Sequence, residues 1–297
     1  TAVARVMIEG HLASGDAMMS EPAAKSVLAA YGIPTVETHI VTTPAEAAAK
    51  AQAMGFPVAL KILSPDISHK SDVGGVDLFL DTAEAVTASA ERMLKIIGEK
   101  FPDAHIEGFT VQRMADRAKA HELIVGVTCD AIFGPVILFG QGGTAVEVIA
   151  DRAVSLPPLN MHLARDLVTR TRVWRLLQGY RDRPPVDMDA LCLTLIQISQ
   201  MIVDIPEIME LDINPLLADE NGVLALDARI RVARPTGDRS RDLAIRPYPA
   251  ELEEPFPLHN GLEVLLRPIR PEDEPEHREF LGRLTPEDIR FRFFGLV

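Results

Sequence analysis

The feature that most limits how this chain can fold is a turn, Asn221-Gly222, between two runs of alternating apolar and polar residues, 208–218 and 222–232. An Asn-Gly pair in this setting is a strong signal for a β-hairpin, which pairs its strands antiparallel. Three further strand-like stretches are separated by turn signals, at 109–114, 121–128 and 134–140. Helix signals lie between the strands, so the sequence predicts α+β lobes and not a doubly wound parallel sheet.

Helix starts are marked by capping residues. Ser20-Glu21-Pro22 opens a helix, and the capping box Thr43-Pro44-Ala45-Glu46 opens another that ends at Gly55. The pattern of apolar residues predicts three more helices, over 83–98, 161–179 and 187–203, and short strands over 58–63 and 76–80. Residues 1–19 are expected to be a tail or a linker remnant.

Composition narrows the class of protein. The 297 residues allow one large domain or two ordinary ones, and 47% apolar with 25% charged residues is typical of a soluble globular protein. No apolar run reaches the roughly 20 residues of a membrane span. Arg5 and Glu9 interrupt the N-terminal apolar stretch, which therefore does not resemble a signal peptide. Cys129 and Cys192 form neither a metal pattern nor a disulfide framework, which suits a reducing cytoplasm. A net charge of −13 would repel a nucleic-acid backbone.

Lysine is scarce, so its positions are informative. The chain has seven lysines against 23 arginines, and none follows Lys119. Lys61 stands in the middle of the apolar strand VALKIL, where an unpaired buried ammonium group would be costly. It is therefore either a lysine of an edge strand that faces solvent or a charge held rigidly over a phosphate.

The loop that follows this strand, SPDISHKSDVGG (64–75), collects polar groups and glycines. Its backbone N–H groups could wrap phosphates while Lys70 adds charge, and His69 could accept a phosphoryl group or act as an acid or base. The alternative is an ordinary polar turn with an exposed histidine. Lys61, nine residues before Lys70, favours the functional interpretation.

A second glycine-rich loop, Gly140-Gln141-Gly142-Gly143, follows an apolar strand. Its spacing matches neither a dinucleotide fingerprint nor a Walker loop. A tight turn is the simplest interpretation, although glycines also let a backbone approach a phosphate closely.

The hairpin at Asn221 brings oxygen-bearing side chains together. Asp212 and Asn214, two residues apart, share one face of a strand, and Asp227 lies on the partner strand at a similar height. Carboxylate and amide oxygens suit Mg²⁺, which shares its ligands with nucleotide phosphates. The alternative is a solvated polar face, but the surrounding residues are strongly apolar.

Six segments, taken in order, resemble the ATP-grasp region of NDP-forming acyl-CoA synthetases, which is homologous to the β subunit of succinyl-CoA synthetase. They are YGIP, GFPVALKI, SPDISHKSDVGGV, HELIVGVTCDAIFGPVILFGQGGT, ELDINPL and ALDARIRV. The resemblance covers about residues 20–233 and implies a fold in which two α+β lobes clasp ATP, the smaller lobe spanning about 35–113.

The resemblance also implies a role for each matching residue. The nucleotide would be held by Lys61, Lys70, Ser71, Gly74, Gly75 and Glu122, with Val111, Gln112 and Met114 along the adenine. Mg²⁺ would be bound by Asn214 and Asp227 with Asp212 beside them, and His69 would relay a phosphoryl group. Gly140, Gly142, Gly143 and Glu147 would form a phosphate or partner loop.

Residues 234–260 are expected to be a linker, and residues 261–297 resemble the truncated start of a GNAT acetyltransferase domain. This order is similar to bacterial protein lysine acetyltransferases with a fused synthetase-like region. The sequence does not contain the CoA-binding portion expected upstream, with its catalytic histidine, so CoA is expected only in the complete protein. It also does not contain the acetyl-CoA loop expected downstream, so this chain is not expected to acetylate anything.

Two functions remain open at this point. One is the ATP- and Mg²⁺-binding half of a ligase that forms carbon–sulfur bonds, working with a CoA-binding domain or subunit. The other is a nucleotide-sensing or assembly domain of a lysine acetyltransferase, without turnover. The sequence leaves the acyl substrate and a homo-oligomeric state undetermined.

Overall fold

A computed structural model describes residues 2–15, 17–67, 70–143, 151–234, 243–245 and 252–293. The chain divides into two compact units, residues 1–245 and 246–297. The first unit contains two sheets, each with its own hydrophobic core.

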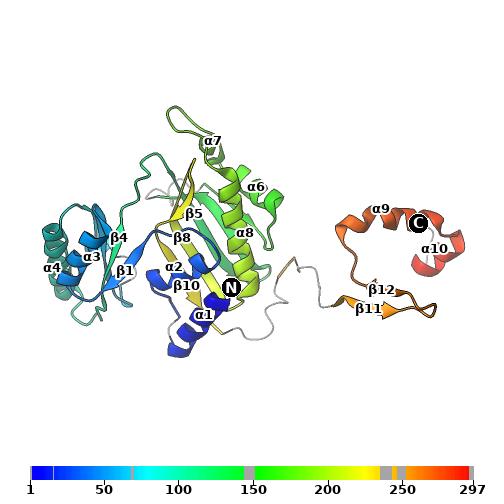
Figure 1. Cartoon of the computed structure of the whole chain (residues 1–297), viewed down its shortest axis with the longest axis horizontal. Helices are drawn as coiled ribbons and strands as arrows, with labels where there is room; N and C mark the ends of the chain where they lie inside the picture. Colours follow the sequence, from blue (N-terminus) through cyan, green and yellow to red (C-terminus); the bar gives the residue numbers. More distant parts are fainter. Residues whose placement is uncertain are drawn as a thin grey trace. The chain divides into compact units, whose positions relative to one another are not determined.

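The smaller sheet is built from four antiparallel strands in the order β1-β4-β2-β3. Its strands are β1 (Thr38–Val41), β2 (Val58–Leu63), β3 (Val76–Leu80) and β4 (Gly108–Arg113). Two helices, α3 (Pro44–Met54) and α4 (Ala83–Lys100), pack against it (Figure 1). Apolar side chains of both helices and of β2 and β4 form one buried cluster.

Local sequence explains where these helices begin. The Thr43 hydroxyl accepts a hydrogen bond from the backbone N–H of Glu46, which caps α3 as the capping box predicts. The Glu46 carboxylate returns to Thr42, one residue earlier than the standard box, and accepts from both its N–H and its hydroxyl. Thr82 caps α4 in the same way, through the N–H of Ala85.

The larger sheet follows the order β10-β8-β5-β6-β7, with β9 paired to β8, and every pairing in it is antiparallel. Its strands are β5 (His121–Asp130), β6 (Gly134–Gln141), β7 (Arg152–Ser155), β8 (Ile208–Asp219), β9 (Gly222–Ala225) and β10 (Ala228–Val232). Asp219 pairs with Gly222, so the predicted hairpin at Asn221 is confirmed. The α+β class is confirmed as well.

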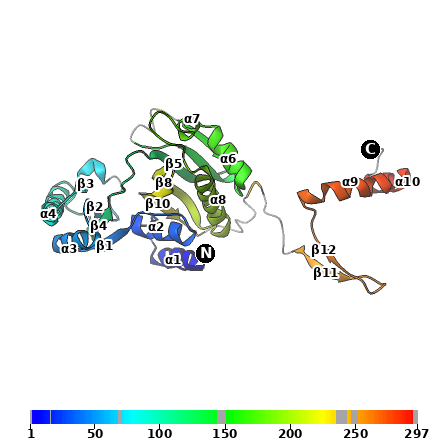
Figure 2. The same ribbon diagram turned by 45° about the horizontal axis from the view of Figure 1, so that its top comes forward.

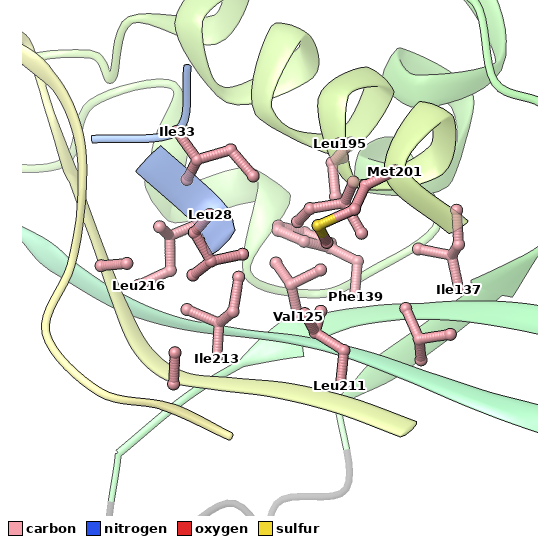
Figure 3. Packing of buried hydrophobic residues seen from close by; sticks show 14 of the residues in the cluster. Leu28, Ile33, Val125, Ile137, Phe139, Leu195, Met201, Leu211, Ile213 and Leu216 are labelled. Carbon is pink, nitrogen blue, oxygen red and sulfur yellow. The ribbon is translucent and has the colours of Figure 1, made fainter. Parts of the chain in front are cut away.

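Helices cover the larger sheet (Figure 2). They are α1 (Ala2–Ser14), α2 (Glu21–Ala30), α6 (Met161–Thr169), α7 (Trp174–Leu177) and α8 (Met188–Asp204). Figure 3 shows Leu195 and Met201 of α8 packed with Val125 and Phe139 of the sheet. Alternate residues of β5 are buried, so one side of the strand faces this core.

Two expectations about the helices differ from the structure. Residues 2–14, expected to be a tail, form α1, because Ala4 and Ile8 lie on one helix face and are buried in the larger core. The helix expected over 161–179 is divided into α6 and α7. The buried Asp151 carboxylate accepts hydrogen bonds from the backbone N–H groups of Arg172 and Val173 and holds the chain between the two helices.

The second unit contains a hairpin of β11 (Glu254–Pro257) and β12 (Glu263–Leu266), then the short helix η4 (Pro271–Asp273), α9 (Glu274–Arg283) and α10 (Pro286–Phe293). β11 lies within the stretch expected to be a linker, because its residues pair with β12. None of the residues whose burial is described in this unit is buried. Across the described parts of the chain, no helix combines the length and apolar character needed to cross a membrane.

Candidate functional site

Lys61 lies in the middle of β2, between two neighbouring strands. It is opposite Thr110 of β4 on one side and Val76 of β3 on the other. β2 is thus an inner strand, and Lys61 is only 8% exposed. The interpretation of Lys61 as an edge-strand lysine facing solvent is therefore wrong.

The loop after β2 folds back beside Lys61. The N–H of Gly75 donates to the carbonyl of Lys70 and the N–H of Ile62 donates to the carbonyl of Gly75, both at 2.8 Å. Ser71 begins the short helix η1 (Ser71–Val73), which ends at Gly74 with a φ of 78°, a left-handed conformation that favours glycine. The loop thus brings Lys70 to the same place as Lys61.

Glu21, which the sequence marks only as part of a helix start, lies at the centre of the lysines. Its Oε1 atom is 2.8 Å from the Nζ atom of Lys25 and 2.8 Å from that of Lys61. Its Oε2 atom is 3.8 Å from the Nζ atom of Lys70. The available signal was a Glu–Lys pair four residues apart in an apolar helix, one partner being a scarce lysine.

We call Glu21, Lys25, Lys61 and Lys70 the lysine cluster. Burial alone would raise the pKa of Glu21, but Lys61 and Lys25 outweigh burial and lower it to about 2. Burial lowers the pKa of Lys25 and of Lys70, although Glu21 opposes the change. Glu21 is therefore ionised at neutral pH, and the lysines would be further stabilised by an additional anion.

The three oxygen-bearing residues of the hairpin lie close together in register. Ile213 of β8 is opposite Ala228 of β10, so Asn214 and Asp227 occupy adjoining positions. Burial raises the pKa of Asp227, and the charge of Glu21 adds to this. Burial also raises the pKa of Asp212, which Arg229 opposes.

A divalent cation fits this donor set. Two carboxylates and one amide provide hard oxygen ligands, and a cation would offset the unfavourable burial of the two carboxylates. Among the described residues, no group of three His, Cys, Asp or Glu side chains could hold a metal ion by itself. Further ligands for Mg²⁺ would then have to come from a bound molecule or water.

The three residues expected along the adenine lie at and just after the end of β4. Val111 is fully buried in the smaller core. The amide oxygen of Gln112 accepts a hydrogen bond of 3.0 Å from Lys25. The N–H of Met114 donates to the carbonyl of Pro57. The Gln112 side chain is thus committed to the lysine cluster.

The second glycine-rich loop is shaped by close contacts between backbones. A Cβ atom at Gly140 would lie 2.1 Å from the Asp151 carbonyl oxygen, and one at Gly142 would lie 2.6 Å from that of Leu123. Gly143 lies against the Glu122 carboxylate. Only glycine fits at the first two positions.

A cavity of about 430 Å³ borders this loop, and Glu122 and Gly142 line it. His121 lines it as well, and no described atom makes a hydrogen bond with its buried Nε2 atom. Two candidates, His69 and Glu147, lie outside the described residues.

Comparison with known proteins identifies the class. The family model for the ATP-grasp domain matches residues 10–232, so the chain belongs to the ATP-grasp family. More particularly, it contains an ATP-grasp domain of the kind found in β subunits of ADP-forming acetate–CoA ligases. It is 34% identical over 229 residues to the β subunit of acetate–CoA ligase (ADP-forming) I of Pyrococcus furiosus, which covers 77% of this chain and 97% of that subunit.

A longer relative and a solved structure are also similar to this chain. The chain is 40% identical over 204 residues to acetate–CoA ligase (ADP-forming) I of Archaeoglobus fulgidus, but this match spans 69% of the chain and only 29% of that protein. The structure is that of dinucleotide-forming acetyl-coenzyme A synthetase 1 of Candidatus Korarchaeum cryptofilum with coenzyme A and Ca-AMPCP. It has a TM-score of 0.74 at 35% identity and covers 77% of this chain and 100% of that one.

A second complex of the same enzyme, with a TM-score of 0.68 at 33% identity, contains Mg-AMPPCP. Its phosphohistidine segment points towards the nucleotide-binding site of that protein. The match again covers 77% of this chain. The family model ends at residue 232, before the second unit begins.

Proposed function

We propose that the ATP-grasp domain binds ATP or ADP with Mg²⁺ and transfers a phosphoryl group between the nucleotide and His69. The observation that carries this proposal is the lysine cluster, in which three buried or nearly buried ammonium groups surround one carboxylate. Transfer of a phosphoryl group depends mainly on holding the phosphates in place and neutralising their charge. Lys61 and Lys70 would do this for the terminal phosphates.

The hairpin oxygens would complete the site. Asn214 and Asp227 would hold Mg²⁺, with Asp212 beside them, and the bound ion would neutralise phosphate charge. The family resemblance assigns the glycines of the first loop, Gly74 and Gly75, to the phosphates and Glu122 to the nucleotide. The sharp return of that loop onto β2 supports the first assignment, because it brings Gly75 beside Lys61.

His69 would be the phosphoryl acceptor. A neutral imidazole has one unprotonated ring nitrogen, and this nitrogen would attack the terminal phosphorus of ATP. The new bond is N–P, the bond that breaks joins phosphorus to the bridging oxygen, and ADP leaves with the electron pair. The phosphohistidine segment of the Korarchaeum enzyme is the precedent for a histidine in this role.

In the complete protein we infer the reaction acyl-CoA + ADP + phosphate ⇌ acid + CoA + ATP, as the names of the relatives suggest. CoA would bind to a further domain or subunit. The GNAT resemblance of residues 261–297 stays a prediction. These residues contain β12, α9 and α10, and the family model does not reach them.

Calorimetry of the whole chain with MgATP and MgADP tests nucleotide binding. Lys61→Ala should abolish it, whereas Lys95→Ala, at an exposed lysine of α4, should leave it unchanged. Incubation with ATP should then place an acid-labile phosphoryl group on the chain that is absent from His69→Ala. No Mg²⁺-dependent binding, together with an unchanged Lys61→Ala, would refute the proposal. Binding without a phosphoryl group on His69 would favour the nucleotide-sensing alternative.

A further inference from the structure

Helix α2 supplies two charged residues to the lysine cluster that have no part in phosphate binding as proposed above. We propose that Glu21, anchored by Lys25, is a positioning residue that holds the Lys61 ammonium group, with Lys70 beside it, where phosphates would bind. This inference rests on the proposed function, because the ligand is the nucleotide phosphate proposed there. The evidence for it is the set of contacts that Glu21 and Lys25 make.

Lys25 has no hydrogen left for a ligand. An ammonium group has three hydrogens to donate. The three of Lys25 go to Oε1 of Glu21 at 2.8 Å, the hydroxyl of Thr38 at 3.0 Å and the amide oxygen of Gln112 at 3.0 Å. The residue is 4% exposed. Lys25 is therefore fixed in place and serves to fix Glu21.

Glu21 passes this constraint on to Lys61. Its Oε1 atom accepts from both Lys25 and Lys61, and a buried carboxylate paired in this way cannot move without leaving a charge unpaired. Within the described part of the chain, the ammonium group of Lys61 donates only to Glu21, and the ammonium group of Lys70 makes no hydrogen bond. Both therefore keep hydrogens that can point to phosphate oxygens.

The same contacts join the two sheets. Ala24 and Leu28 of α2 are buried in the larger core, whereas Lys61, Thr38 and Gln112 belong to β2, β1 and β4 of the smaller sheet. Glu21 and Lys25 are thus charged groups of one lobe that hold polar groups of the other. Without a carboxylate here, three ammonium groups would repel one another across this junction.

The test compares Glu21→Gln, which keeps the shape of the side chain and removes its charge, with Glu37→Gln. Glu37 makes an exposed hydrogen bond of 2.7 Å with Nε2 of His39 and is the matched control. Calorimetry on the full chain should show that Glu21→Gln binds MgATP and MgADP at least about tenfold more weakly, with AMP changed by less than about threefold. Glu37→Gln should bind all three like the parent. Equal losses for all three nucleotides would indicate a merely structural role, and unchanged or tighter MgATP binding would overturn the proposal.

A second measurement needs no nucleotide. Acetic anhydride labels accessible lysine amines, and Lys61 should react faster relative to the exposed Lys95 in Glu21→Gln, because a neutral amide holds the ammonium group less strongly than a carboxylate does. An unchanged ratio of the Lys61 and Lys95 labelling rates would show that Glu21 does not hold Lys61 in solution, and it would overturn the proposal. A parent chain that binds no MgATP would refute the proposed function and the positioning role together. If the parent binds MgATP and Glu21→Gln does not show the expected selective loss, only the positioning role is refuted.

If Glu21→Gln does not fold, Thr38→Val supplies the answer. It removes one of the three acceptors of Lys25 while keeping the shape of the side chain. It should weaken MgATP binding about threefold and leave AMP binding unchanged. MgATP binding equal to that of the parent would overturn the role of Lys25 as the anchor.

Discussion

Gly75 allows the first loop to lie against β2, and Gly75→Ala should separate them. A Cβ atom at this position would lie 2.7 Å from Cγ2 of Ile62 and 3.1 Å from the Lys70 carbonyl oxygen. Carbon atoms pack best at about 3.5–4.0 Å, so the first contact is about 1 Å too short. Ile62 is fully buried and cannot turn away. The loop must therefore move, which should cost about 1–3 kcal/mol.

Two measurements test this: thermal unfolding gives the melting temperature, and calorimetry gives the affinity for MgATP. For a unit of this size, the cost corresponds to a melting temperature lower by about 5 °C. Because Gly75 holds the carbonyl of Lys70, nucleotide binding should weaken as well. Gly98→Ala is the control, since its Cβ would meet nothing within 4 Å in helix α4, where alanine should stabilise by about 0.5–1 kcal/mol. A Gly75→Ala chain that melts at or above the parent temperature would refute the packing argument.

Two further predictions concern ionised groups. Because the pKa of Glu21 is lowered from 4.5 to about 2, its ionised form stabilises the fold above pH 4.5, and about 3 kcal/mol of the free energy of unfolding should be lost as the pH falls toward 2. Urea unfolding at several pH values should show this loss in the parent and not in Glu21→Gln. Parallel plots of unfolding free energy against pH for the two chains would contradict the prediction. Asp151→Asn should lower stability by about 1–3 kcal/mol, because both carboxylate oxygens accept backbone N–H groups at 2.7 Å and an amide can replace only one. Asp130→Asn, where one oxygen accepts both N–H groups, should melt like the parent, and equal melting of both variants would refute the second prediction.

The elements that the sequence predicted well are those set by neighbouring residues. The Asn221-Gly222 turn and the Thr43 cap each act within three residues, so local chemistry decides them. Their positions in the structure agree with the prediction. The hairpin also put Asp227 next to Asn214, because an antiparallel register follows once the turn is fixed.

The features that the sequence did not predict depend on distant residues. Lys61 is 40 residues from Glu21, and Gln112 is 87 residues from Lys25, so no local pattern marks these contacts. The break between α6 and α7 likewise depends on Asp151, about twenty residues before it. Such contacts follow from how two sheets and their helices pack, which periodicity does not determine.

The lysine cluster also explains how a chain of net charge −13 could attract a polyphosphate. Three of its seven lysines gather around Glu21, so positive charge is concentrated at one place although the whole chain is acidic. Screening limits the repulsion from distant carboxylates to about 8 Å at physiological ionic strength, whereas contacts inside a buried site are screened much less. Because the same four side chains also join the two lobes, a nucleotide that engages Lys61 and Lys70 would act directly on the contact between the lobes.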